Sequence, residues 1–319
     1  MTIIKEIFQK IHKNHKYAYF LMVNVVFLSC VSNFTASRSS NSTDFGTVIV
    51  RRLSDYCPSL RNNPADTAVY VLDSGKSGAN LLLVAGAHGN EIAGIRAADF
   101  FAEHALIERG RVFVIPRLNV SGVSAGTRLV QPENQGEPDP DVYIPPDGST
   151  PYAGMERRNI NRSYPGTEYA GVTQKIALAV MQLLISENID IAIDMHEASL
   201  SSNMAWTIVS NPKNVQIAAL AVLDLEEKGI PMHLEASAPN MDGLSHKEWG
   251  DRTQAMSFLI ETANPAQETN VLSDELNDSR YSLDRRVAIQ LETIRLLTAR
   301  CNEVLPAALV YSGIGEYAQ

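Results

Sequence analysis

The stretch LLLVAGAHGNE at residues 81–91 decides the fold of this chain. It begins with five consecutive apolar residues, a pattern typical of a strand that is buried on both faces of a sheet. A turn containing Gly86 and Gly89 follows, and residues 91–107 have the apolar spacing of a helix. A buried strand that turns directly into a helix is the repeating unit of α/β proteins.

The rest of the chain repeats this alternation. Apolar runs predict further strands at residues 68–72, 112–115, 189–193, 207–209 and 257–260, and apolar residues recur at helical spacing over 172–183 and 287–297. There is no internal repeat and no convincing linker beyond residue 47. We therefore predict one α/β catalytic domain over residues 47–319.

The overall composition and charge argue against a nucleic-acid-binding function. The chain has 319 residues, of which 45% are hydrophobic and 20% are charged, so it can bury a sizeable core. Its formal net charge is -9, and no patch rich in lysine and arginine occurs outside the first sixteen residues. We predict no nucleic-acid partner, because such a partner requires a basic surface.

The amino terminus has the features of an export signal. Four lysines precede the apolar run at 17–29, which is shorter than the roughly 20 residues that cross a bilayer, so residues 1–29 are predicted to be a signal peptide. The sequence FLSC at 27–30 resembles a bacterial lipoprotein cleavage box, and we hypothesise that Cys30 is lipidated. Cleavage near Ala36 and an uncleaved anchor stay open.

The next segment, residues 30–46, is rich in serine and asparagine and is predicted to be a flexible tether. These features predict an exported, periplasmic protein, attached to a membrane if Cys30 carries lipid. The two other cysteines, Cys57 and Cys301, could be paired or could be free thiols, and their spacing does not decide between these states.

A metal site is indicated where two predicted strands end. His88 and Glu91 are three residues apart in the turn after the first strand, so both side chains can point to one side. His196 follows the apolar run at 189–193 and supplies a third ligand. Two histidines and one glutamate are a common catalytic zinc set, with the fourth position kept for water. His233 and His246 are the competing histidines.

Two further segments complete the predicted site. Residues 158–162, RNINR, contain four arginine or asparagine donors, which suit the binding of a carboxylate. Glu261 ends the apolar run at 256–260, where a charge is costly unless it is used, and we predict that it is the general base.

The motifs GAHGNE (86–91), NINRSYPG (159–166) and LIET (259–262), with His196 between the last two, resemble the zinc metallocarboxypeptidase family, and in particular its succinylglutamate desuccinylase and aspartoacylase-like branch. The resemblance implies a central mixed, mostly parallel sheet flanked by helices on both faces. It also implies one zinc ion and assigns the residues their roles. The metal ligands are His88, Glu91 and His196; the substrate carboxylate is bound by Asn161 and Arg162; and catalysis is driven by Glu261.

In this family an arginine before the asparagine polarises the scissile carbonyl. We choose Arg158 for this role, and Arg157 and Arg128 stay open because the family's spacing varies here. The resemblance has two departures: no tyrosine lies between Tyr169 and Tyr281, where carboxypeptidases have one that contacts substrate, and only one helix and a tail follow Glu261 in place of a β-rich region.

The predicted function is a zinc-dependent hydrolase that cleaves an amide bond next to a free carboxylate. A peptide terminus, an N-acyl amino acid and a cell-wall stem peptide all fit as substrate. A serine hydrolase built on Ser124 in the sequence GVSAG (122–126) is disfavoured, because a nucleophile elbow needs a strand before it and a helix after it. A binding protein without turnover is the other alternative. The long segment 119–158, rich in glycine and proline, is predicted to be an ordered loop that contributes to specificity.

Overall fold

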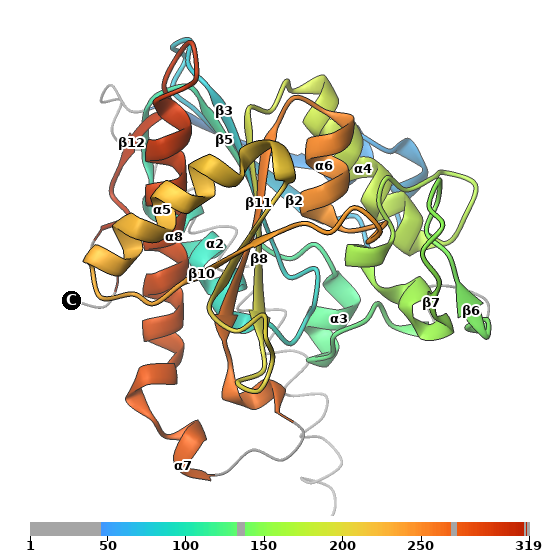
Figure 1. Ribbon diagram of the computed structural model, residues 1–319. Helices are drawn as coiled ribbons and strands as arrows, with labels where there is room; N and C mark the ends of the chain where they lie inside the picture. Colours follow the sequence, from blue (N-terminus) through green and yellow to red (C-terminus); the bar gives the residue numbers. More distant parts are fainter. Residues whose placement is uncertain (1–45, 133–137, 269–272, 316, 318–319) are drawn as a thin grey trace, which may run out of the picture. The chain divides into compact units, whose positions relative to one another are not determined.

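Eight strands form the central sheet of the protein (Figure 1). The computed structural model describes residues 46–132, 138–268, 273–315 and 317. The strands lie in the order β1 (Thr47–Arg52), β2 (Ala68–Asp73), β5 (Arg111–Ile115), β3 (Asn80–Ala85), β8 (Ile191–Ala198), β11 (Met256–Ala263), β9 (Thr207–Ser210) and β10 (His233–Ala236). The predicted signal peptide, Cys30 and the tether up to residue 45 lie outside the described residues.

The sheet is mixed, as predicted. The pairs β3–β5, β3–β8, β8–β11 and β9–β10 are parallel, whereas β1–β2, β2–β5 and β9–β11 are antiparallel. Two small two-stranded sheets stand apart from it: β4 (Leu106–Arg109) with β12 (Val310–Ser312), and β6 (Val142–Tyr143) with β7 (Tyr152–Ala153).

Helices cover both faces of this sheet, which confirms the predicted architecture. The helices α2 (Ile92–His104), α5 (Val215–Glu227) and α8 (Leu283–Asn302) lie on one side, and α4 (Val172–Ser186) and α6 (Ser245–Arg252) lie on the other (Figure 1). The short helices are α3 (Val120–Ala125) and α7 (Ser273–Leu276). Short segments of 3-10 helix occur at η1 (Leu53–Asp55), η2 (Pro58–Leu60), η4 (Gly154–Arg158), η5 (Ile160–Arg162), η6 (Pro212–Asn214), η7 (Pro265–Gln267) and η8 (Ser279–Tyr281).

The core follows the apolar runs of the sequence. Residues 81–85 of β3 and 191–196 of β8 are fully buried or nearly so, because each of these strands has helices packed on both faces. Such burial stabilises the fold by roughly 25 cal/mol for each Å² of apolar surface removed from water. Elsewhere in the core, the buried rings of Tyr164 and of Trp249 on α6 pack edge to face, with centroids 5.4 Å apart.

All six predicted strands are present in the central sheet, but two strands of this sheet and the four strands of the two small sheets were not predicted. Strand β1 lies at one edge of the sheet and β10 at the other, and both expose most of their residues. The buried residues Cys57 and Cys301 are free thiols. Among the described residues, no helix is both long enough and apolar enough to cross a bilayer.

Candidate metal centre

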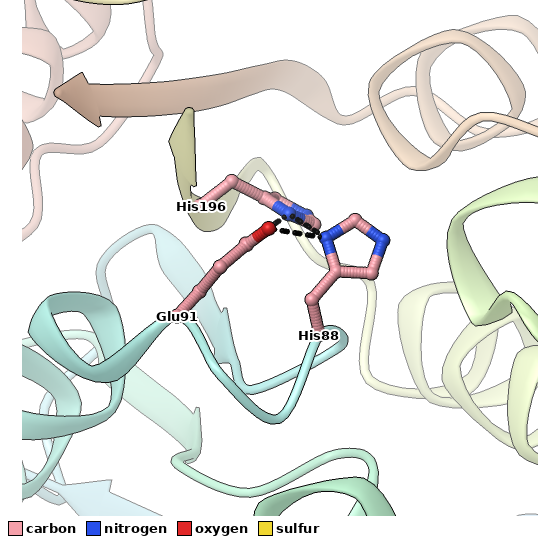
Figure 2. A group of neighbouring side chains, drawn as sticks. All are labelled: His88, Glu91 and His196. Carbon is pink, nitrogen blue, oxygen red and sulfur yellow. Dashed lines mark hydrogen bonds and ion pairs between the residues drawn. The ribbon is translucent and has the colours of Figure 1, made fainter. Parts of the chain in front are cut away.

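Three buried side chains from two distant parts of the chain converge on one point (Figure 2). His88 lies in the turn after β3, Glu91 is the N-cap residue of α2, and His196 lies on β8. The Nδ1 atoms of His88 and His196 are 3.0 Å apart, and they lie 2.6 and 2.8 Å from the two carboxylate oxygens of Glu91. Each side chain is at most 3% exposed. One metal ion could bind all three.

Strand pairing and glycine produce this convergence. Because β3 and β8 are parallel neighbours, with Ala85 opposite Met195, their carboxyl ends meet at the same edge of the sheet. Gly86 begins the turn with φ +68°, a conformation that favours glycine. A Cβ at Gly89 would lie 2.0 Å from the carbonyl carbon of Gly122, so only glycine fits where α3 approaches the turn.

The contacts of the Nε2 atoms of His88 and His196 indicate whether these residues suit zinc. His88 Nε2 lies 3.0 Å from Asn159 Oδ1, and His196 Nε2 lies 2.9 Å from Asp194 Oδ2. At His88 this acceptor favours the tautomer with its proton on Nε2, which leaves the Nδ1 lone pair facing the cluster. At His196 burial would lower the pKa, but Asp194 and Glu91 outweigh it and raise this pKa well above its usual value, so metal binding there would release a proton. Two imidazole nitrogens and a carboxylate form a donor set that suits zinc.

The charges of the cluster favour the ligand form of two residues. Burial lowers the pKa of His88 to about 4, which leaves the imidazole neutral near pH 7. Burial would raise the pKa of Glu91, but the adjacent His88 and His196 outweigh it and hold this pKa below its usual value. A neutral imidazole and an ionised carboxylate are the forms that bind metal.

Glu261 lies next to this cluster but outside it. It is on β11, opposite His196 in the parallel pair β8–β11. Its Oε2 atom is enclosed and has no hydrogen-bond partner among the described residues. Burial raises the pKa of Glu261 to about 8; His196 opposes this rise and Glu91 adds to it. A carboxyl group with a raised pKa beside a metal site has the properties of a proton carrier.

The arginines of the long loop differ in their placement. Arg128 Nη1 lies 3.2 Å from Glu91 Oε1, and its side chain is 43% exposed, so it lies at the open side of the cluster. Arg158 Nε instead donates to Asp139 Oδ2 at 2.9 Å, and its Nη1 donates to the carbonyl of Val130 at 3.0 Å. The contacts of Arg158 therefore brace the loop, whereas Arg128 reaches the cluster through Glu91.

The predicted carboxylate-binding residues lie together after η4. Asn161 Oδ1 accepts from the backbone N–H of Ser245 at 2.8 Å, which orients the amide. The Arg162 guanidinium lies over the ring of Tyr152, 5.1 Å from its centroid, and the Tyr152 hydroxyl donates to the carbonyl of Asp242 at 2.9 Å. The long loop thus brings a tyrosine next to Arg162, although none occurs between Tyr169 and Tyr281 in the sequence.

Sequence reasoning missed Asp194 and the support given by Asn159. Asp194 interrupts an apolar strand two residues before His196, and residues two apart point to the same face, so this signal was available. Asn159 was counted only as one donor of the RNINR motif. The structure also locates the residues of the alternative readings. Ser124, the nucleophile of the serine hydrolase alternative, is exposed and lies inside α3, not at a strand-to-helix elbow. The competing histidines, His233 and His246, lie outside the cluster.

The fold is zinc carboxypeptidase-like, and its site brings together three residues that could hold a metal ion. Residues 77–269 match the family model of the succinylglutamate desuccinylase/aspartoacylase catalytic domain. The chain therefore belongs to the succinylglutamate desuccinylase/aspartoacylase family, whose solved relatives have zinc carboxypeptidase-like folds.

Comparison with individual proteins agrees with this family. The chain is 31% identical over 121 residues to the N-alpha-acetyl-L-2,4-diaminobutyric acid deacetylase of Halomonas elongata. The matched region covers 37% of this chain and 28% of the deacetylase. Among solved structures it resembles a metallo-carboxypeptidase from Burkholderia cenocepacia, with TM-score 0.55, 10% identity and coverage of 86% of this chain and 69% of the other.

Another similar structure is the tripeptide-bound cell shape determinant Csd4 of Helicobacter pylori. Its TM-score is 0.53 at 14% identity, with coverage of 84% of this chain and 56% of Csd4. The chain thus spans about a quarter of the length of the deacetylase and just over half of Csd4. At these identities the solved structures show a shared fold.

Proposed function

We propose that this protein is a zinc-dependent hydrolase that cleaves an amide bond next to a free carboxylate. The observation that carries the proposal is the cluster of His88, Glu91 and His196, in which both imidazoles present Nδ1 to one point and His88 is anchored at Nε2 by Asn159. Glu261 stands beside the cluster on the next strand, where a proton carrier is needed.

The residues of the site divide the reaction between them. A zinc ion bound here would supply positive charge that makes water acidic near neutral pH and favours the ionised form of Glu261. Glu261 then accepts a proton from the attacking water and delivers it to the leaving amine. Arg128 stabilises the negative charge that develops on the carbonyl oxygen, and Asn161 and Arg162 hold the substrate carboxylate.

The substrate class follows from the carboxylate site. The deacetylase relative acts on an N-acetylated amino acid, and Csd4 binds a tripeptide, so both have ligands that fit a site with Arg162. We therefore propose N-acyl amino acids and short peptides with a free terminal carboxylate. The serine hydrolase built on Ser124 has no comparable support.

A substrate panel tests this proposal. The protein lacking residues 1–29 and loaded with zinc should hydrolyse members of a set of N-acyl amino acids and di- and tripeptides. The matched terminal carboxamides should react at least about tenfold more slowly, because they lose the charge-assisted pair with Arg162. Equal rates on acids and amides would exclude the carboxylate-directed reaction.

Arginine variants test which residue faces the carbonyl oxygen. Arg128→Ala should lower kcat by about 100- to 1,000-fold, the usual effect of removing one oxyanion-stabilising donor. Arg158→Ala should act mainly on stability, because its partners are Asp139 and Val130. Steady-state kinetics and thermal unfolding of both variants distinguish these effects, and a larger loss of kcat in Arg158→Ala would reverse the roles.

We also propose that the protein is exported and that Cys30 is lipidated. The support is the lysine-rich leader, its short apolar run and the FLSC sequence. Palmitate labelling in a bacterial host should mark the parent and not Cys30→Ser, and globomycin should cause the precursor to accumulate. A processed protein without label would contradict lipidation while leaving export intact.

A further inference from the structure

Glu156 lies where the predicted carboxylate site meets the support of the metal cluster. It is in η4, and its side chain is 23% exposed. Its Oε2 atom accepts from Asn159 Nδ2 at 2.6 Å and lies 4.0 Å from Arg162 Nε. Glu156 thus contacts the residue that anchors His88 without touching a metal ligand in the described contacts.

The hydrogen bonds of Asn159 fix which way its amide points. Asn159 Oδ1 lies 2.9 Å from the backbone N–H of Asn161, a group that can only donate. This contact identifies Oδ1 as the acceptor, so Nδ2 must be the atom that faces Glu156. A flipped amide would lose the bond to Asn161 and would place an oxygen against the Glu156 carboxylate.

The orientation of Asn159 in turn determines the tautomer of His88. Asn159 Oδ1 lies 3.0 Å from His88 Nε2, so this nitrogen carries the proton and Nδ1 presents its lone pair to the cluster. If the amide flipped, its NH₂ group would face Nε2 and favour the tautomer protonated at Nδ1. A proton at Nδ1 would block the position where His88 binds metal.

We infer that Glu156 is a positioning residue that, through the Asn159 amide, holds His88 in its metal-binding tautomer. The inference rests on the proposed function in that His88 is a zinc ligand. Burial supports it, because Asn159 is fully buried and His88 is 2% exposed, so no solvent can substitute for a lost partner without rearrangement.

The test compares zinc affinity in two Glu156 variants by competition with a chromophoric chelator. Glu156→Met removes the acceptor at similar size and should weaken zinc binding by about 10- to 100-fold, as expected when the support of a ligand is lost. Glu156→Gln keeps an oxygen that can accept from Asn159 Nδ2, so its affinity should stay within about fivefold of the parent. Glu168→Gln, which alters an exposed glutamate, is the matched control and should bind zinc like the parent.

A second measurement reads the tautomer itself. Long-range ¹H–¹⁵N NMR of the metal-free protein should show the His88 proton on Nε2 in the parent and in Glu156→Gln, and a mixture of tautomers in Glu156→Met. A Glu156→Met protein with parental zinc affinity and an unchanged His88 tautomer would overturn the inference. A parent protein that binds no zinc would instead overturn the proposed function.

A double-mutant cycle keeps the inference testable if Glu156→Met does not fold. Asn159→Asp places a carboxylate next to that of Glu156. Adding Glu156→Gln restores a hydrogen bond, because the new amide at position 156 can donate to the new carboxylate at position 159. Glu156→Gln should therefore raise the zinc affinity of the Asn159→Asp variant at least about threefold more than it changes that of the parent. Equal effects in both backgrounds would show that the two residues are not linked.

Discussion

Glu261→Gln should lower kcat by about 100- to 10,000-fold while zinc affinity and substrate binding remain near parental values. Glutamine fills nearly the same space as glutamate but cannot accept and return a proton. The effect should fall on kcat, because Glu261 lies opposite His196 on the adjacent strand and is not one of the three clustered ligands. Steady-state kinetics, together with zinc titration of the same preparation, measures both quantities.

The exposed Glu235 on β10 provides the matched control. Glu235→Gln changes charge by the same amount and should leave kcat unchanged. Turnover by Glu261→Gln at the parental rate would remove Glu261 from the mechanism, whereas loss of zinc in this variant would indicate that Glu261 supports the metal.

Glu261 should also make the stability of the metal-free protein depend on pH. Its pKa is raised to about 8 in the folded state from a usual value of 4.5, so the unfolded chain releases this proton first as pH rises. The Glu261 carboxyl therefore adds to the free energy of unfolding below about pH 4.5, and this contribution is lost as pH rises from 4.5 to 8. Urea unfolding should show this decline in the parent, and the decline should be smaller in Glu261→Gln.

His196→Ala should abolish specific zinc binding and, with it, turnover. The parent should be inactivated by a chelator, reactivated by zinc, and stabilised by about 4 kcal/mol when free zinc is a thousand times Kd. His196→Ala removes one of three ligands and leaves Asp194 without its partner, so none of these responses should remain. Unfolding curves with and without zinc measure the difference.

His233→Ala, which alters an exposed histidine on β10 outside the cluster, is the control and should respond to zinc like the parent. A zinc-dependent rise in the stability of His196→Ala equal to that of the parent would place the metal elsewhere.

Features set by short-range pattern could be predicted from the sequence. The runs in β3 and β8 are apolar on both faces, so they were predicted as central strands, and the turn at His88 and Glu91 followed from its position after β3. Strand β10 was missed because it is an exposed edge strand of four residues without an apolar run. Helix α5 was missed although its apolar residues recur at helical spacing.

Which arginine contacts the metal cluster depends on tertiary structure. Arg128 lies far before Asn161 in the chain, and only the path of the loop at 119–158 brings it to Glu91 while Arg158 turns to Asp139. Neither residue carries a local pattern that distinguishes these two outcomes. The anchoring of His88 by Asn159 likewise depends on contact across 71 positions, which spacing alone does not reveal.

X-ray data collected on both sides of the zinc absorption edge, from crystals of the zinc-loaded protein, locate the metal directly. We expect one strong anomalous peak, within bonding distance of the Nδ1 atoms of His88 and His196 and of a Glu91 carboxylate oxygen. A peak bound elsewhere, or no peak among these three side chains in protein shown to contain zinc, would contradict this expectation.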